Sequence, residues 1–413
     1  MTSDATTVPR LVARTVEIDD PGPLVELLPA DEPMTWLRQG GGLVAWGVAA
    51  RFDSAGVDRF ADASAWWREV VRVAAVADEV TVPGTGLITL GSFAFADSPG
   101  DSVLIVPSVV VGKRGERSWM TTIGTSPEAL PDLSPHGVPE APSNLMFADG
   151  ALSGAEWEGV VWEAVLHLNA GELDKVVLAR DLVATADAPI DVRWPLRRLA
   201  AQYEMCWTFH VDGLFGATPE MLVRREKGLV TSRVLAGTIR RTGDDEHDLR
   251  LAATLARSSK DLEEHEYAVR SVADALAPYC SSMNVPETPF VLHLPNVMHL
   301  ATDVAGVAHD SGANVLELAA ALHPSAAVGG TPTKVAVEMI AEIEGMDRGR
   351  YAGPVGWMDT RGDGEFGIAL RSGELDGDRV RLFAGCGIVA GSDPEAELAE
   401  SQAKFVPVRD SLS

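Results

Sequence analysis

The sequence is poor in cysteine, and the few cysteines that it has are far apart. Among 413 residues there are three, Cys206, Cys280 and Cys386. None of them belongs to a paired spacing of the kind that binds zinc or forms a redox centre. A disulfide framework and a cysteine-rich metal site are therefore excluded, and we expect a reducing, cytoplasmic setting for the protein.

Long hydrophobic runs and excess positive charge are also missing. No apolar run is long enough to span a membrane, and the first ten residues lack the hydrophobic core of a secretory signal. The 34 Lys and Arg residues face 60 Asp and Glu residues, so the net charge is −26. Such a charge argues against nucleic acid or an anionic membrane as a partner. The hydrophobic content of 46% is enough for the large core of a globular enzyme.

The pattern along the chain predicts an α+β fold with large, mainly antiparallel sheets in a single domain, residues 1–413. Residues 1–10 are expected to be disordered, and the Pro-rich stretch 126–145 is expected to be a loop. Strands are predicted near 43–51, 86–95, 102–111, 174–185, 205–212, 220–225, 229–235, 289–294, 302–309, 353–360, 365–372 and 379–386. Helices are predicted at 63–78, 155–170, 313–322 and 333–344, with a long helical pattern inside 235–276 that follows a strand and a turn.

The segment from Arg379 to Phe405 combines a glycine-rich strand end with the start of a helix. Asp393 is suited to cap this helix, and Pro394 suits its first position. The spacing of Ser392 and Glu395 is also that of a capping box.

On the same helix, Glu397, Glu400 and Lys404 fall at i, i+3 and i+7 and share one face. Two acids and a base beside a glycine-walled strand indicate a site. The alternative is an exposed helix with a Glu400–Lys404 salt bridge.

A second acidic pair lies on the long helical pattern. Its apolar stripe runs through Ala268 and Val272, and projecting that face backwards brings Glu264 and Asp261 onto it. Carboxylates that extend a buried face are costly unless a cation or donors compensate them. Acid pairs on two helices that meet across a core suit Mg²⁺, which keeps several waters and leaves positions for substrate oxygens. The alternative is that Asp261 and Glu264 cap the end of a broken helix.

Six ordered blocks carry a family resemblance. They are LDKVVLAR (173–180), FGATPEML (215–222), LAGT (235–238), SKDLEEH (259–265), LHPSAAVGGTP (322–332) and AGCGIVAGSDPEAELAESQAKF (384–405). With them, residues 155–408 resemble the chorismate-utilising enzymes (the anthranilate synthase component I-like, isochorismate synthase and salicylate synthase group), and most of all the isochorismate synthases. The resemblance implies a two-sheet β core flanked by helices, with the N-terminal third in the same fold and the site between the halves.

The resemblance assigns a base and an acid. Isochorismate formation adds water at C2 of chorismate while the C4 hydroxyl departs. Lys175 matches the family's base, and Glu220 matches its general acid, with Thr218 where serine is usual. An acid that is protonated near neutral pH needs a raised pKa, so we expect an apolar or acid-rich pocket around Glu220. Read locally, the two residues could instead be a strand-end lysine that reaches water and a solvated glutamate.

The resemblance also assigns the metal and substrate contacts. Glu264 and Glu400 match Mg²⁺ ligands, with Asp261 and Glu397 placed to act directly or through waters. Because chorismate is a dianion and the chain is strongly negative, the metal and a few cations must reverse the potential locally. The expected substrate contacts are Gly237, Thr238, His299, Ala327, Tyr351, Arg371, Gly385, Gly387 and Lys404. Arg371 and Tyr351 match the groups that hold the enolpyruvyl carboxylate, whereas His299 could equally be a packed structural residue.

A few positions indicate the subclass. Lys175 favours water over ammonia as the nucleophile, and Ala236 stands where aminodeoxychorismate synthases often carry lysine. No amidotransferase partner is therefore expected. Ala327 stands where salicylate-forming relatives tend to have threonine, which favours an enzyme that stops at isochorismate. A salicylate synthase is the alternative, and a non-catalytic chorismate-binding relative is a third. A monomer is expected, because no oligomer seam is visible in the pattern.

Overall fold

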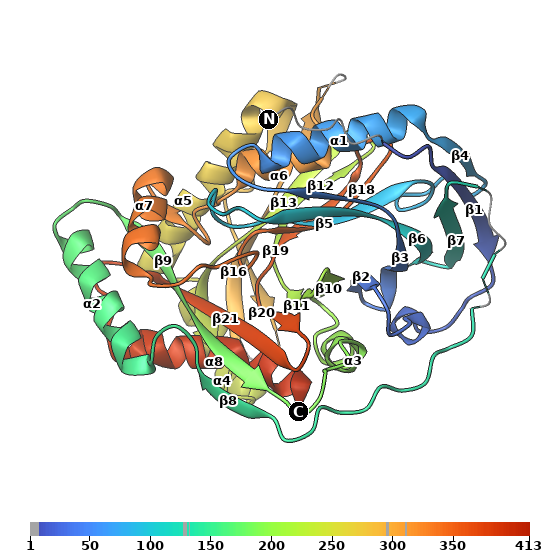
Figure 1. Ribbon diagram of the computed structural model, residues 1–413. Helices are drawn as coiled ribbons and strands as arrows, with labels where there is room; N and C mark the ends of the chain where they lie inside the picture. Colours follow the sequence, from blue (N-terminus) through green and yellow to red (C-terminus); the bar gives the residue numbers. More distant parts are fainter. Residues whose placement is uncertain (1–7, 127–129, 132, 295–296, 310–311) are drawn as a thin grey trace, which may run out of the picture.

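Two arms of one β-sheet form the centre of the molecule (Figure 1). The computed structural model describes residues 8–126, 130–131, 133–294, 297–309 and 312–413, except the side chains of Lys260 and Glu264. Both arms start at strand β6 (Ser102–Arg114), whose two ends pair with different strands on one side. Every strand pairing of the described residues is antiparallel except that of β1 with β4.

The first arm runs from β6 to β9. Its strands, in order of pairing, are β3 (Gly41–Ser54), β2 (Pro33–Arg38), β10 (Trp207–Val211), β11 (Leu214–Thr218), β20 (Ser372–Asp376), β21 (Arg379–Ile388) and β9 (Lys175–Thr185). Two short strands pair with opposite ends of β9: β8 (Met146–Asp149) and β17 (Gly330–Thr331).

The second arm runs from β6 to β16. Its strands, in order of pairing, are β5 (Ile88–Ser92), β18 (Pro354–Asp359), β19 (Gly364–Ile368), β12 (Met221–Glu226), β13 (Leu229–Arg240) and β16 (Val297–Ala308), with β14 (Cys280–Asn284) and β15 (Phe290–His293) at its outer edge. The N-terminal strands extend β6 in another direction: β7 (Arg117–Gly124), β1 (Val12–Ile18) and β4 (Ala75–Asp78).

Helices cover each arm. The helices packed on the strands of the second arm and on β3 are α1 (Arg59–Val73), α4 (Asp245–Leu255), α5 (Ser259–Leu276) and α6 (Val315–Leu322). Those packed on the first arm are α2 (Gly154–Asn169), α3 (Arg193–Gln202), α7 (Thr333–Ile343) and α8 (Pro394–Leu412). In Figure 1, α1 and α6 lie along the top and α2 and α8 at the lower left. Two short 3-10 turns, Leu24–Leu27 and Ala277–Tyr279, complete the elements.

The hydrophobic core follows this division. One large buried cluster includes Trp66 of α1, Val272 of α5 and Leu318 of α6. A second cluster lies where α3 and α8 pack on the first arm and includes Leu196 and Phe405. The predicted α+β fold with large, mainly antiparallel sheets and flanking helices is therefore confirmed.

Several element predictions were wrong or incomplete. The patterns of β1, β2, β7 and β14 were not recognised as strands. The predicted helix 63–78 ends at Val73, and Ala75–Asp78 form β4 against β1.

The predicted long helix inside 235–276 is two helices. β13 extends through Arg240, α4 ends at Leu255, and α5 begins at Ser259 after the cap Ser258, whose hydroxyl accepts the Asp261 N–H. Residues 235–240 form a strand despite their helical periodicity, because β13 pairs with β16 along its whole length.

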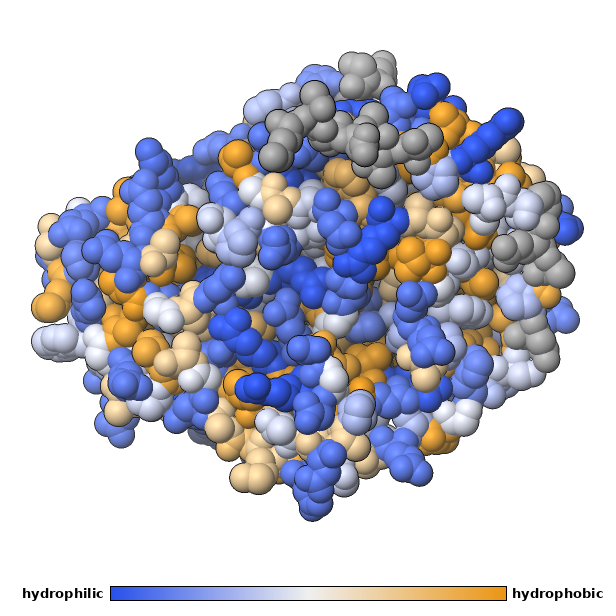
Figure 2. All heavy atoms as spheres, viewed as in Figure 1, coloured by the Kyte–Doolittle hydropathy of each residue, from blue (hydrophilic) through white to orange (hydrophobic). Residues whose placement is uncertain are grey.

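The N-terminal segment and the long connection 126–145 are the two stretches that were expected to lack regular structure. Residues 1–7 of the predicted disordered segment lie outside the described residues, and Val8 packs against the core. The described residues of 126–145 form neither helix nor strand. Polar residues cover most of the face in Figure 2, with apolar residues scattered among them. No helix of the described residues is long and apolar enough to cross a membrane.

Candidate active site

One cavity of about 250 Å³ lies where the two arms, α5 and α8 come together. It brings together every site residue that the sequence indicated, with one exception: Lys175, Glu220, Gly237, Thr238, Asp261, His299, Ala327, Tyr351, Arg371, Gly385, Gly387, Glu397, Glu400 and Lys404. The exception is Glu264. Its backbone is part of α5, but its side chain lies outside the described residues.

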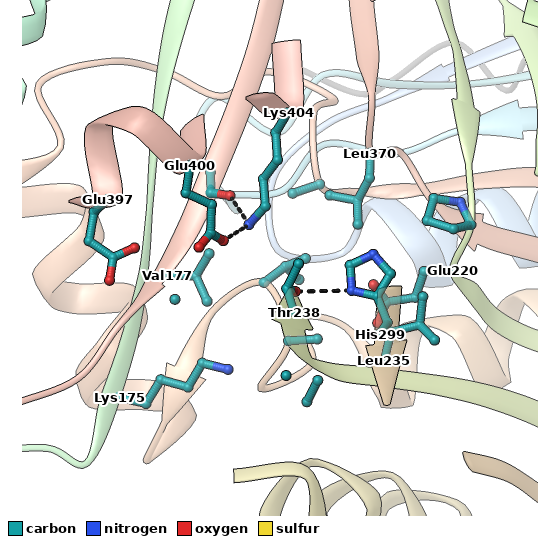
Figure 3. A pocket seen from close by; sticks show the side chains of 18 of the residues that line it. Lys175, Val177, Glu220, Leu235, Thr238, His299, Leu370, Glu397, Glu400 and Lys404 are labelled. Carbon is teal, nitrogen blue, oxygen red and sulfur yellow. Dashed lines mark hydrogen bonds and ion pairs between the residues drawn. The ribbon is translucent and has the colours of Figure 1, made fainter. Parts of the chain in front are cut away.

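Lys175 enters the cavity from the first arm. It is the first residue of β9, where Thr331 of β17 pairs with it, and its side chain is buried. Val177, two residues further along the strand, lines the same cavity because alternate residues share one face. Figure 3 shows the Lys175 ammonium directed into the space between Glu400 and Thr238. The lysine therefore does not reach out to bulk water, as the local reading of the sequence allowed.

Glu220 lies in the short connection from β11 of the first arm to β12 of the second arm, and backbone hydrogen bonds hold it in place. Its N–H donates to Thr218 Oγ1 at 3.2 Å, and its carbonyl accepts the Ile368 N–H at 3.1 Å. Thr218 is fully buried, so the hydroxyl that replaces the usual serine fixes the turn before β12. The Glu220 side chain is only 6% exposed, which rules out the solvated glutamate that the local sequence allowed.

Burial raises the pKa of Glu220 to about 7. The nearby charges of Arg371, Lys175 and Lys404 and a hydrogen bond from the Leu235 backbone act in the opposite direction but do not outweigh burial. The pKa shift agrees with the expectation for a general acid, because a substantial fraction of the carboxyl is protonated at neutral pH.

Gly237 lies in a β-bulge of β13. The pairing of β13 with β16 shifts register between Ala236 and Thr238, and Gly237 has φ of 78°. A Cβ at this position would lie 3.2 Å from Cβ of Asp261, so glycine lets α5 approach the strand. The bulge turns Thr238 toward His299 on β16.

His299 is a buried, neutral imidazole. Its Nδ1 lies 3.0 Å from Thr238 Oγ1 (Figure 3). Burial, assisted by the charges of Arg371 and Lys404, lowers the pKa of His299 to about 3. Its Nε2 has no hydrogen-bond partner among the described residues, although the side chain lines the cavity. A buried polar atom of this kind is available to a bound ligand.

Tyr351 is positioned by stacking. Its ring packs on Phe383 with centroids 4.9 Å apart and planes 8° from parallel. Burial raises the pKa of Tyr351 to about 12, so the phenol remains a neutral donor. A Cβ at Gly385 would lie 3.1 Å from the phenol oxygen, which explains the glycine at that point of β21.

The backbone of Arg371 is not in the extended strand conformation that the sequence predicted. β19 ends at Ile368, and Arg371 lies in the connection to β20 with φ of 50°. It therefore lies outside a strand, although the sequence predicted one over 365–372. Gly367 accommodates a close approach of protein, because a Cβ there would lie 3.1 Å from the Glu220 carbonyl oxygen.

Helix α8 contributes two acids, Glu397 and Glu400, and the cation Lys404 to the lining of the cavity. Asp393 caps the helix by accepting the Ala396 N–H. The predicted capping box of Ser392 and Glu395 does not form, because the Ser392 hydroxyl accepts the Val389 N–H and donates to Glu397 at 2.7 Å.

Lys404 and Glu400 form an ion pair at 2.5 Å, and Lys404 also donates to the Gly385 carbonyl at 2.9 Å. The pair is not the exposed salt bridge of the alternative reading, because the Lys404 side chain is 12% exposed. Burial acts to raise the pKa of Glu400, but Lys404, Arg371 and Lys175 outweigh it, so the net pKa is lowered. Glu400 is therefore ionised.

Glu397 and Glu400 also come close enough to share an ion. Their carboxylate oxygens and Cys386 Sγ all lie within 4.8 Å of one another. Burial raises the pKa of the Cys386 thiol to about 12, so it offers no thiolate at neutral pH. The two carboxylates are hard oxygen donors, which fit Mg²⁺.

A family model described as chorismate binding enzyme matches residues 9–413. The chain belongs to this family. Among curated relatives, the isochorismate synthase MenF of Bacillus subtilis is 38% identical over 261 residues, covering 62% of this chain and 55% of that protein. The isochorismate synthase DhbC of the same organism is 42% identical over 261 residues, 60% of this chain and 66% of that protein. The chain thus matches less than two thirds of these two relatives.

Longer matches cover nearly all of the chain. The salicylate biosynthesis isochorismate synthase of Pseudomonas aeruginosa is 34% identical over 98% of this chain and 90% of its own length. A crystal structure of a putative 2,3-dihydroxybenzoate-specific isochorismate synthase, DhbC from Bacillus anthracis, superposes with a TM-score of 0.78 at 32% identity. The superposition covers 94% of this chain and 98% of that structure. The family resemblance inferred from the six sequence blocks is therefore confirmed.

Arg348 is a cavity residue that the sequence reasoning missed. It is buried and binds Glu344 through two hydrogen bonds of 2.5 and 2.7 Å. It also donates to the carbonyls of Val328 and Val177, and so fastens the 323–332 segment to β9 beside Lys175. The i, i+4 spacing of Glu344 and Arg348 was the available signal, but exposed pairs share that spacing.

Proposed function

We propose that the protein is a magnesium-dependent isochorismate synthase, which converts chorismate to isochorismate. The observation that carries the proposal is that Lys175 of β9 and Glu220 of the β11–β12 connection face one cavity, in which Glu220 has a pKa of about 7. The names of the relatives support the same activity.

Lys175 and Glu220 supply the two proton transfers. Lys175 acts as the base that takes a proton from the water that adds at C2 of the ring. Glu220 donates its proton to the C4 hydroxyl, which leaves as water while the ring double bonds shift. Base and acid must act on different positions of one substrate, and the placement of Lys175 and Glu220 in one cavity supports this.

Cations and donors around the cavity hold the anionic substrate. Arg371 is suited to bind the enolpyruvyl carboxylate in two-point fashion, and Tyr351 adds a neutral phenol donor. His299, neutral and with an unpartnered Nε2 among the described residues, is suited to a ring hydroxyl. Lys404 contributes positive charge that counters the net charge of −26 over the whole chain.

Glu400 would hold the Mg²⁺ ion, with Glu397 and Asp261 in the same cavity placed to act directly or through waters. The family resemblance adds Glu264 as the second ligand. When bound, the ion supplies positive charge that neutralises a substrate carboxylate. The oxygen-rich donor set of α8 supports this assignment.

Two positions set the expected outcome of the reaction. The presence of Lys175 favours water as nucleophile, so the enzyme works without an amidotransferase subunit. Ala327, a small apolar residue in the cavity wall, favours release of isochorismate over further elimination of pyruvate. We further propose that the enzyme acts in the cytoplasm as a monomer.

Product analysis tests the proposal. The purified protein is incubated with chorismate and Mg²⁺, and the products are separated by chromatography. Isochorismate alone is the expected result. Salicylate with pyruvate would identify a salicylate synthase, and binding of chorismate without turnover would identify a non-catalytic relative. Anthranilate formed with added ammonia would overturn the assignment of water as the nucleophile.

A further inference from the structure

A second, very small cavity lies behind Glu220. Its volume of about 10 Å³ corresponds to the space of one water molecule. Glu220 and Ala327 line both this cavity and the main one, so they form part of the wall between the two. The other walls are residues of β12, β13, α5, β19 and the segment after α6: Leu222, Ser232, Arg233, Val234, Ala268, Val272, Ser325, Ala326 and Ile368.

Ser325 brings an unsatisfied hydroxyl to this cavity. The residue is 8% exposed, and its Oγ has no hydrogen-bond partner among the residues that the structure describes. Its carbonyl accepts the N–H groups of Val328 and Gly329 at 3.1 and 2.9 Å, so the backbone holds the side chain in place. A buried hydroxyl without a partner costs free energy unless water or another polar group satisfies it.

The other polar groups around the small cavity leave Glu220 as the partner for such a water. The Arg233 guanidinium is already bound to Asp303 through two hydrogen bonds of 2.7 and 2.8 Å. Ser232 is buried in β13 and offers a further hydroxyl. A single water between the Ser325 hydroxyl and the Glu220 carboxyl would thus find two to three polar partners, which is the usual number for a buried water.

We propose that Ser325 is a positioning residue for Glu220, acting through one buried water that it holds in the small cavity. The inference rests on the proposed function, in which Glu220 protonates the leaving hydroxyl. Ser325 donates to the water, and the water donates to the carboxyl oxygen that faces away from the substrate. The acidic proton of Glu220 is then directed into the main cavity, toward the hydroxyl that it protonates.

The charged groups around Glu220 also affect its pKa. They are Lys175 from β9, Arg371 from the β19–β20 connection and Lys404 from α8. His299 from β16 is neutral, and Arg233 from β13 is paired. These groups remain in place when Ser325 is changed, so a change in the titration of Glu220 reports the loss of the water-mediated hydrogen bond.

Ser325→Ala tests the proposal, with Ser118→Ala as the matched control. Ser118 of β7 is likewise buried with an unpartnered hydroxyl among the described residues, but it lines neither cavity. Because a donor to the ionised carboxyl is lost, the alkaline limb of the pH profile of kcat/KM should move upward by about 0.5 to 1 pH unit in Ser325→Ala. Ser118→Ala should keep the wild-type profile.

Val272→Ile provides a second test without altering the hydroxyl. The added methylene fills the small cavity from α5 and displaces the water, so the alkaline limb should move in the same direction. An infrared titration of the Glu220 carboxyl, identified by its loss in Glu220→Gln, measures the same shift without turnover. This measurement keeps the inference testable if the protein fails to make isochorismate, which would overturn the proposed function alone.

The results would differ if the Ser325 hydroxyl had no water as its partner. Removing a buried, unsatisfied polar group stabilises a protein, so Ser325→Ala would then raise the melting temperature as Ser118→Ala does. An unchanged titration of Glu220 in both Ser325→Ala and Val272→Ile would overturn the proposal.

Discussion

Thr238 and His299 face each other across β13 and β16, with 3.0 Å between Thr238 Oγ1 and His299 Nδ1. The contact depends on the bulge at Gly237, because the register of the two strands shifts there. It fixes the imidazole, whose Nε2 has no partner within the described part of the chain.

His299→Ala should therefore lower kcat/KM for chorismate by about 10- to 100-fold, the range expected for loss of one buried hydrogen bond to substrate. Thr238→Val keeps the imidazole and should cost less than about tenfold, because only the orientation of the ring is loosened. Steady-state kinetics measures both. Equal kinetics for His299→Ala and wild type would identify His299 as a packed structural residue.

Lys175→Ala should remove the base that activates water. We expect kcat to fall by about 10²- to 10⁴-fold, the usual contribution of a positioned general base. Magnesium-dependent binding of chorismate, measured by calorimetry, should remain detectable, since the cations that hold the carboxylates are unchanged. Full activity of this variant would refute the role of Lys175.

Glu220 should make the stability of the protein depend on pH. Its pKa is about 7 in the folded protein against an ordinary value of 4.5, so the folded state binds more protons between these values. The stabilisation is complete below about 4.5 and is lost as the pH rises through 7. Glu220→Gln lacks this titration. Thermal unfolding without metal should show Glu220→Gln gaining stability relative to wild type from about pH 5 to about pH 8, and the variant should show no turnover.

Activity should also depend on a divalent ion held by α8. Chelation of Mg²⁺ should stop turnover, and Mn²⁺ should partly restore it, because both accept oxygen ligands. Glu400→Gln should weaken Mg²⁺ binding by about tenfold or more in calorimetry, because one carboxylate ligand is lost. Glu395→Gln, at an exposed position in the first turn of the same helix and outside the cavity lining, is the matched control and should bind Mg²⁺ like wild type. Undiminished activity in excess chelator would contradict the metal assignment.

Ala327→Thr tests the subclass. Threonine at this position of the cavity wall should allow some elimination of pyruvate from isochorismate. A coupled assay with lactate dehydrogenase measures pyruvate, and wild type should release none under the same conditions. If the variant releases none either, Ala327 does not decide where the reaction stops.

Most of the residues that the sequence selected come together in space. Fourteen of the fifteen residues selected from the sequence line one cavity, and the side chain of the fifteenth, Glu264, lies outside the described residues. The raised pKa of Glu220 was also anticipated, since an acid in an apolar pocket resists ionisation. The local backbone geometry was not anticipated. The bulge at Gly237 and the left-handed conformation of Arg371 depend on strand register, which neighbouring strands decide.

The sequence by itself determined the identity of the acids, bases and glycines and the helical faces that carry them, because spacing of about 3.6 or 2 residues is a local property. The tertiary structure decided which of these groups meet. Lys175 and Glu220 are 45 positions apart in the chain, one at the start of β9 and the other between β11 and β12, so no local pattern relates them. Three features exist only after long-range pairing has buried polar atoms and fixed their partners. They are the ion pair of Glu344 and Arg348, the position of His299 in the cavity and the small cavity at Ser325.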